Sequence, residues 1–326
     1  MEFLDSSLRV LAVDVGASKL RIAIFHGLDL VYRAIIDTPR NGGPYAVANA
    51  IIRYARDYRF DVASIASIGP LDLVRGWVTG TPNNPLRDFA LRDPIYKSFN
   101  VPVYIANDCV ASVWGEYVLG NGRGLNDIVY VTISTGIGVG AIVDGHLLVG
   151  RRGNSHEAGH IVLDLNSSLK CGCGGLGHWE ALAGGSNISK LAKLKALEST
   201  YTSKGREIAL SGGMSSEILY RLAREGDVFA LNLVDYLNRV HTAGLASLIA
   251  VYDPEAIFIG GSIYIYNEDL IAPGIMKYIR EYSLLEPPPI RRATFDQDSG
   301  LYGALAIALK TPQEIARYTR YSGGDD

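Results

Sequence analysis

Two parts of the sequence repeat the same pattern, in which apolar strands are joined by short turns of small residues. In the first part, the strand-like runs are residues 8–15, 20–25 and 30–36. In the second part, they are residues 128–133, 139–143 and 146–149. Apolar and β-branched residues dominate these runs, which is typical of buried or half-buried strands. The duplication predicts two related α/β halves that face each other as two lobes across a cleft.

The remaining segments complete an α/β pattern. Apolar residues at helical spacing predict helices at residues 44–59, 108–119, 179–197, 215–224, 227–251 and 299–309. Short apolar runs predict further strands at residues 64–68, 71–78, 101–105, 161–165 and 256–259. No linker or low-complexity segment marks a clean boundary between domains.

Composition and charge narrow the class of protein. The net charge of -3, with both signs mixed along the chain, argues against a nucleic-acid-binding surface. No apolar run approaches the ~20 residues of a membrane-spanning helix, and the first residues, MEFLDSSLRV, lack the pattern of a signal peptide. The cysteines do not form a disulfide framework, since Cys171 and Cys173 are one residue apart and Cys109 is expected to be a buried apolar residue. We therefore expect a soluble, cytoplasmic protein.

One short segment gathers cysteine and histidine. His160, Cys171, Cys173 and His178 follow a C-x-C-x4-H pattern with one histidine upstream. Two thiolates and two imidazoles are a ligand set that tetrahedral Zn²⁺ prefers, and a closed site with four protein ligands is structural. The sequence therefore predicts a structural zinc site.

The same segment contains a rival motif. Residues 156–160 match the H-E-x-x-H pattern of zinc proteases, which requires a helix so that both histidines share one face. The preceding residues are polar and Gly-rich, Gly159 lies inside the motif, and residues 161–165 are strand-like. These features argue against a protease.

Two turns have residues suited to phosphate. Residues 14–19 form the first phosphate turn and residues 134–138 the second, and both offer glycines and hydroxyl groups where backbone N–H groups approach an anion closely. Asp14 would hold a Mg²⁺ that bridges phosphate oxygens, and Lys19 would offset phosphate charge. Gly260 and Gly261 follow a third buried strand. Either turn alone is compatible with an ordinary hairpin, but their repetition favours phosphate binding.

Isolated polar residues suggest a hydroxyl substrate. Asp108 follows a buried strand and opens a helix, so it is either an N-cap or a general base that takes a proton from an attacking hydroxyl. Asn107 would then orient the same ligand. Glu157 and Glu180 have small or apolar neighbours, which suits rigid carboxylates that accept sugar hydroxyls.

These motifs together resemble the ROK family of sugar kinases (repressor, open reading frame, kinase), within the actin-like and hexokinase-like ATPases. The segment DVGASKLR resembles the first phosphate motif of the family, STGIGVG resembles the second, and AIFIGGS resembles the adenosine motif. The segment HEAGH, followed by CGCGGLGHWE, resembles the sugar and zinc signature of the family. The resemblance extends over residues 8–309 and implies the two-lobed, ribonuclease H-like ATPase fold. It implies a small lobe of residues 1–107 plus about 300–326, and a large lobe of residues 108–299.

Residue by residue, the resemblance implies a set of ligands. It implies Asp108 as the base, and as sugar ligands Asn83, Asn107, Asp108, Glu157, His160 and Glu180. For ATP and Mg²⁺ it implies Asp14, Gly16, Ser18, Lys19, Thr135, Gly136, Gly138, Gly260 and Gly261. His156 replaces the first glycine of the usual signature, and His178 replaces its third zinc cysteine. Either His156 or His160 could therefore complete the zinc site.

The implied activity is an ATP-dependent hexokinase that phosphorylates the 6-hydroxyl of glucose and of related hexoses or N-acetylhexosamines. Within the family, the broad-specificity hexokinases of archaea are most similar. The expected partners are a hexose and ATP, and a second copy of the chain in a homodimer is a further candidate. The alternatives are a narrower N-acetylmannosamine, N-acetylglucosamine or fructose kinase, and a sugar-sensing regulator without catalysis. Repressors of the family begin with a DNA-binding segment, which we do not expect before Leu8.

Overall fold

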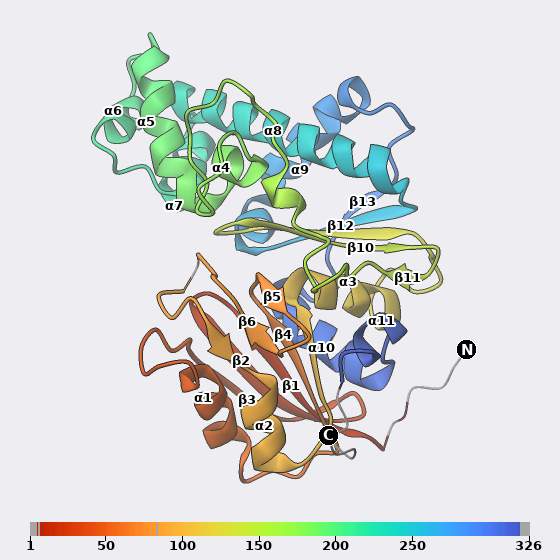
Figure 1. The fold of residues 1–326 in the computed structure, drawn as a ribbon. Helices are drawn as coiled ribbons and strands as arrows, with labels where there is room; N and C mark the ends of the chain where they lie inside the picture. Colours follow the sequence, from red (N-terminus) through yellow and green to blue (C-terminus); the bar gives the residue numbers. More distant parts are fainter. Residues whose placement is uncertain (1–4, 6, 83, 320–326) are drawn as a thin grey trace. The chain divides into compact units, whose positions relative to one another are not determined.

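The computed structural model describes residues 5, 7–82 and 84–319 (Figure 1).

The first of two five-stranded sheets carries the N-terminal meander. The strands of this sheet are β1 (Arg9–Val15), β2 (Lys19–His26), β3 (Asp29–Asp37), β4 (Val62–Ser67) and β8 (Val103–Asn107). Their order is β3-β2-β1-β4-β8, with β1 antiparallel to β2 and parallel to β4. The predicted meander is therefore confirmed.

A second sheet repeats this arrangement. Its strands are β9 (Ile128–Ile133), β10 (Ile137–Val143), β11 (His146–Leu147), β12 (Ala256–Gly260) and β13 (Ile290–Arg292). Their order, β11-β10-β9-β12-β13, is that of the first sheet when each set is numbered along the chain. This equivalence confirms the duplicated α/β fold that the sequence predicts.

The central strands are the most deeply buried. All residues of β4 and β12 are buried, as are the last six of β1. Strands covered on both faces consist of continuous apolar runs rather than alternating ones, which is why these strands are clear in the sequence. The edge strand β3 instead has mostly exposed or half-exposed residues.

Helices cover the sheets. Within the described residues they are α1 (Ala46–Ala55), α2 (Arg92–Phe99), α3 (Asp108–Val118), α4 (Trp179–Ala183), α5 (Ile188–Glu198), α6 (Lys204–Leu210), α7 (Ser216–Arg224), α8 (Val228–Tyr252), α9 (Ser262–Tyr282), α10 (Ser299–Leu309) and α11 (Gln313–Ala316). The short 3-10 helices are η1 (Ala158–His160), η2 (Gly185–Asn187) and η3 (Asp296–Asp298). Among the described helices, none has an apolar stretch long enough to cross a membrane.

Three predicted elements are wrong in detail. The helix predicted at 179–197 is broken into α4, η2 and α5, because the backbone of Gly184 is extended, with φ of -71° and ψ of 144°, and ends α4. The strand predicted at 71–78 is split into β5 (Leu71–Asp72) and β6 (Trp77–Val78), which form a small sheet with β7 (Phe89–Ala90). The strand predicted at 161–165 is reduced to one bridge, between Val162 and His178.

Internal contacts divide the chain into two compact units. The first contains Met1–Tyr130, Gly140–His156 and Ala293–Asp326, and the second contains Val131–Val139 and Glu157–Arg292. In the first unit, α10 packs on α3 and on β1 and β4. Gly303 of α10 meets the backbone of Ala111 in α3, so only glycine permits this close helix contact. The small lobe of 1–107 with 300–326 and the large lobe of 108–299 stay predictions.

Candidate active site and metal centre

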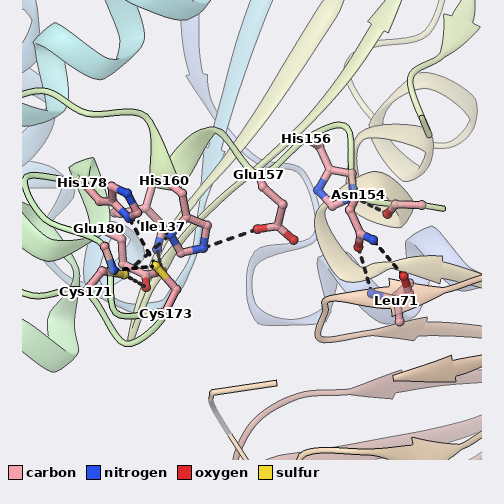
Figure 2. A network of polar contacts seen from close by, with 12 residues as sticks. Leu71, Ile137, Asn154, His156, Glu157, His160, Cys171, Cys173, His178 and Glu180 are labelled. Carbon is pink, nitrogen blue, oxygen red and sulfur yellow. Dashed lines mark hydrogen bonds and ion pairs between the residues drawn. The ribbon is translucent and has the colours of Figure 1, made fainter. Parts of the chain in front are cut away.

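Four metal-ligating side chains of the second unit converge in a metal cluster (Figure 2). Its members are His160, Cys171, Cys173 and His178, whose ligand atoms all lie within 4.8 Å of one another. The two Nδ1 atoms of His160 and His178 are 3.3 Å apart. The Sγ of Cys171 is 3.6 Å from Nδ1 of His160, and the Sγ of Cys173 is 3.3 Å from Nδ1 of His178.

These separations fit a tetrahedral metal ion. Zinc binds imidazole nitrogen at about 2.0–2.1 Å and thiolate sulfur at about 2.3 Å, so tetrahedral ligands lie about 3.3 Å apart for two nitrogens and about 3.6 Å for nitrogen and sulfur. The separation of the two histidine nitrogens and that of Cys171 from His160 agree with these values, and the separation of Cys173 from His178, at 3.3 Å, is slightly shorter. The cluster is therefore compatible with Zn²⁺, and its second histidine besides His178 is His160 rather than His156.

Tight turns bring the cysteines to the cluster. The N–H of Cys171 donates to the carbonyl of Gly175 at 2.9 Å, and the N–H of Gly174 donates back to the carbonyl of Cys171 at 2.9 Å. Gly174 has φ of 94°, in the left-handed region that favours glycine. Gly175 lies against the ring of His178, where a Cβ atom would not fit. Gly174 is thus favoured by the turn, and Gly175 by the position of the His178 ring.

His156 has a different role from His160. Its Nε2 donates to the carbonyl of Gly153 at 2.8 Å, and the side chain is buried. Only residues 158–160 of the H-E-x-x-H motif are helical, and they form the short η1. The protease motif therefore lacks the helix it needs, as the sequence indicates.

Burial of His156 makes stability depend on pH. Burial lowers the pKa of His156 to about 4, below its ordinary value of 6.5. A neutral histidine of this kind stabilises the fold above about pH 6.5, and the contribution is lost as pH falls toward 4. We expect the free energy of unfolding, measured with urea, to be lower at pH 4 than at pH 7 in the native protein. In His156→Asn this decrease should be smaller by about 3 kcal/mol.

Asn154 offers a control in the same loop. Its side-chain amide exchanges two hydrogen bonds of 2.8 Å with the backbone of Leu71, and it does not titrate (Figure 2). Asn154→Ala should lower stability equally at both pH values. The interpretation fails if His156→Asn shows the native pH dependence.

Glu157 and His160 present polar atoms at a partly exposed surface. The Nε2 of His160 is 3.6 Å from Oε2 of Glu157, and the two side chains are 28% and 34% exposed. The ring of His160 therefore has one nitrogen in the metal cluster and the other beside a carboxylate. Burial raises the pKa of Glu157, and the nearby charge of Glu180 adds to this effect. Such a pair can accept and donate hydrogen bonds to hydroxyl groups of a ligand.

Glu180 contacts both the metal cluster and the second phosphate turn. It lies in the first turn of α4, where its Oε1 accepts from Sγ of Cys171 at 3.1 Å. Its Oε2 accepts from the backbone N–H of Ile137 at 3.0 Å. The sequence predicts a sugar ligand at this position but does not indicate the contact with Ile137.

The second phosphate turn and the adenosine motif are brought together. Thr135 is exposed at the tip of the turn, between β9 and β10, while Gly136 and Gly138 are partly exposed. Gly260 ends β12, and Gly261 follows with φ of 89°. A Cβ atom on Gly261 would lie 2.5 Å from the carbonyl oxygen of Ile133, so glycine permits this close approach. The turn and the two glycines thus adjoin in the second unit.

In the first phosphate turn, Asp14 is buried and paired with an arginine that the sequence analysis missed. Arg21 faces Asp14 across the β1–β2 pair, and its Nη1 donates to Oδ2 of Asp14 at 3.0 Å. Burial raises the pKa of Asp14 to about 7; Arg21 opposes this shift, and the carboxylates of Asp108 and Asp298 add to it. A further cation near Asp14 would stabilise the ionised form of its carboxylate, so the position is compatible with Mg²⁺ binding. The signal in the sequence that could have identified Arg21 is the antiparallel pairing of the first two strands of the predicted meander, which places Arg21 opposite Asp14.

The rest of the first phosphate turn is compact and exposed at its tip. The N–H of Gly16 donates to the carbonyl of Lys19 at 2.9 Å, and a Cβ atom on Gly16 would be 2.9 Å from the same oxygen. Ser18 and Lys19 are exposed. The ammonium group of Lys19 forms an ion pair of 2.7 Å with Asp37, so its partner in this structure is a carboxylate.

The N-terminus of α3 distinguishes the roles of Asn107 and Asp108. The N-cap is Asn107, whose Oδ1 accepts from the N–H of Cys109 at 2.8 Å and of Val110 at 3.4 Å. Asp108 is the first helical residue and is half-buried. Because Asn107 is the N-cap of α3, helix capping does not explain why an aspartate is present at position 108. Asn83, which the resemblance implies as a sugar ligand, lies outside the described residues.

Known proteins of one family match this chain over most of its length. Residues 10–311 match the ROK family. A glucokinase of Pyrobaculum calidifontis is 40% identical over 311 residues, which cover 95% of this chain and 98% of the relative. The fold is similar to the ROK hexokinase from Thermus thermophilus, with a TM-score of 0.78 and 32% identity over 93% of this chain and 99% of that one. A ROK family glucokinase from Streptomyces griseus, solved with glucose and AMPPNP, has a TM-score of 0.75 and 28% identity over 91% and 97% of the chains.

Proposed function

Since this chain belongs to the ROK family, we propose that it is an ATP-dependent hexokinase that phosphorylates the 6-hydroxyl of glucose and related hexoses. The observation that carries the proposal is the position of His160, shared between the metal cluster and Glu157. A metal-oriented imidazole beside a rigid carboxylate is suited to a ligand rich in hydroxyl groups. Relatives similar over nearly the whole chain are glucokinases, which supports glucose as the substrate.

On the sugar side, the second unit supplies three groups. Glu157 and Glu180 would accept hydrogen bonds from sugar hydroxyls, and His160 would contribute its Nε2. The side chains of Glu157 and His160 are each about one-third exposed, so a ligand can reach them, which supports this role. From the first unit, Asn83, Asn107 and Asp108 are proposed as further sugar ligands, by their place in the family motifs.

Asp108 is proposed as the general base. A carboxylate that accepts the proton of the 6-hydroxyl as it attacks the γ-phosphate increases the nucleophilicity of that oxygen. Asp108 is half-buried and is the first residue of α3. The close packing of α3 on α10 fixes the direction of the helix.

The nucleotide is proposed to bind the two phosphate turns. Backbone N–H groups around Gly16 and Gly136 would approach phosphate oxygens, with Ser18 and Thr135 donating from their hydroxyl groups. Gly260 and Gly261 would lie beneath the nucleoside, and Gly138 would complete the second turn. Asp14 would hold the Mg²⁺, which offsets phosphate charge when bound. Lys19 would contribute to phosphate binding only after leaving Asp37.

The metal cluster is proposed to bind a structural zinc ion. Its four protein ligands leave no position for a substrate, which distinguishes it from a catalytic site. The cluster would instead hold His160 and the start of α4, with Glu180, in fixed orientation.

A sugar panel tests the function. ADP release from MgATP should be measured by a coupled assay with glucose, mannose, fructose, N-acetylglucosamine and N-acetylmannosamine. We expect glucose to be phosphorylated with the highest kcat/KM. Activity confined to one N-acetylhexosamine or to fructose would favour the narrower kinase. Glucose binding in calorimetry without ADP release from any sugar would favour a sensor and contradict the proposal.

A further inference from the structure

Residues 180–186, from the first turn of α4 into η2, are bonded to the second phosphate turn at three places. The N–H of Gly185 donates to the carbonyl of Ser134 at 2.9 Å, and the N–H of Ser186 donates to that of Thr135 at 2.9 Å. The third bond joins the N–H of Ile137 to Oε2 of Glu180 at 3.0 Å (Figure 2). Two of these bonds are between backbone groups, so Glu180 is the side chain on which the attachment depends.

Gly136 shows how closely Glu180 approaches the turn. A Cβ atom at position 136 would overlap Oε2 of Glu180. The φ of Gly136 is not in the left-handed region, so backbone conformation does not explain the glycine there. The carboxylate of Glu180 therefore occupies the space that a side chain at position 136 would need.

We propose that Glu180 is a positioning residue for the second phosphate turn in addition to a sugar ligand, and that it couples the affinities for sugar and nucleotide. The inference rests on the proposed kinase function for the identity of the two ligands. Its geometric basis is independent of that function, because the contacts with Ile137 and Gly136 join the two segments directly. Coupling of this kind is reciprocal, so a change on either side should alter binding on the other.

Hydrogen-bond chemistry predicts different effects for two substitutions of Glu180. The N–H of Ile137 needs an acceptor, which a glutamine carbonyl supplies and an alanine does not. Glu180→Gln should therefore keep the turn in place while weakening the sugar contact, since a neutral amide is a poorer partner for sugar hydroxyls than a carboxylate. Glu180→Ala should disturb both.

Calorimetry with MgADP in the absence of sugar tests the inference. We expect Glu180→Ala to bind MgADP about five- to tenfold more weakly than the native protein, as for the loss of one hydrogen bond to a backbone group. Glu180→Gln should stay within about twofold of native. Glu157→Ala is the matched control, because the structure places its carboxylate beside His160, and it should weaken glucose binding alone. Zinc content of each variant shows whether Cys171 still holds metal.

The reverse substitution keeps the test decisive if Glu180→Ala folds poorly. Gly136→Ala substitutes none of the proposed sugar or metal ligands, but its added Cβ atom displaces the Glu180 carboxylate. We expect glucose binding to weaken at least about threefold, in line with a modest local overpacking. Native MgADP affinity in Glu180→Ala, or native glucose affinity in Gly136→Ala, would overturn the coupling. Absence of sugar phosphorylation by the native protein would overturn the kinase function and leave the MgADP comparison intact.

Discussion

Asp108→Ala is expected to lower kcat for glucose phosphorylation by about 10²–10⁴, with glucose affinity close to native. Alanine removes the group that would accept the hydroxyl proton in the transition state, whereas the proposed contacts of Glu157, His160 and Glu180 with the sugar remain. The measurement is steady-state kinetics at saturating MgATP, together with glucose binding by calorimetry. A loss of kcat without loss of binding identifies an interaction made in the transition state.

Asp108→Asn separates proton transfer from the structure of α3. Its side-chain carbonyl can still accept the hydrogen bond that Oδ1 of Asp108 receives from the N–H of Cys109 at 2.9 Å. It cannot accept a proton at neutral pH. We expect the asparagine variant to be nearly as slow as the alanine variant. Turnover near the native rate in Asp108→Asn would contradict the assignment of the base.

The parts of the fold that the sequence predicts are those with one dominant physical signal. The runs that became β1, β4 and β12 are predominantly apolar because these strands are buried, with Asp14 in β1 and Ser64 and Ser67 in β4 as the polar exceptions among the buried residues. The repeated strand-turn-strand pattern predicted two related α/β halves, and the matching strand orders of the two sheets agree with that duplication. Signals of this kind are local, so one sequence is enough to detect them.

The missed helix α9 shows where local signals fail. It contains Pro273 and Gly274, which disfavour a helix interior, and it is kinked at Asn267. Nδ2 of Asn267 donates to the carbonyl of Ile263 at 2.8 Å, and Gly274 allows close contact with Asn238 of α8. Tertiary packing on α8 therefore overrides weak propensity, and only the folded structure contains that information.

The candidate site divides in the same way. Cysteine and histidine are rare and specific, so their spacing in the sequence predicts the metal cluster, and the structure places His160 rather than His156 beside the two cysteines. The pairing of Asp14 with Arg21 depends on strand register, and the contact of Glu180 with Ile137 joins residues 43 positions apart. Asp14 and Arg21 belong to one motif, DVGASKLR, but only the strand register shows that they face each other. The contact of Glu180 with Ile137 joins two motifs far apart in the sequence, and neither motif indicates it.

Loss of the metal cluster is expected to have the second large effect. Within residues 161–178, Leu165 is 92% exposed and Val162 and Leu176 are each 51% exposed, while Leu169 and Cys171 are the buried apolar side chains. Isolated bridges, such as that between Lys170 and Leu176, add little order. A segment of this kind needs a metal to fix it. In Cys171→Ser with Cys173→Ser, we expect zinc to fall from about one per chain to below about 0.1.

Glucose binding should weaken with the metal, because the ion would orient His160 and the residues around Glu180. We expect at least about a tenfold loss of glucose affinity, comparable to the loss of an oriented shell around a metal ligand. Zinc is measured by elemental analysis and glucose affinity by calorimetry. Cys109→Ala is the matched control, since this cysteine is buried in α3 outside the cluster and should keep native zinc and affinity. Full zinc content in the double variant would show that the thiolates of Cys171 and Cys173 are not the ligands, because two imidazoles alone do not complete a closed tetrahedral site.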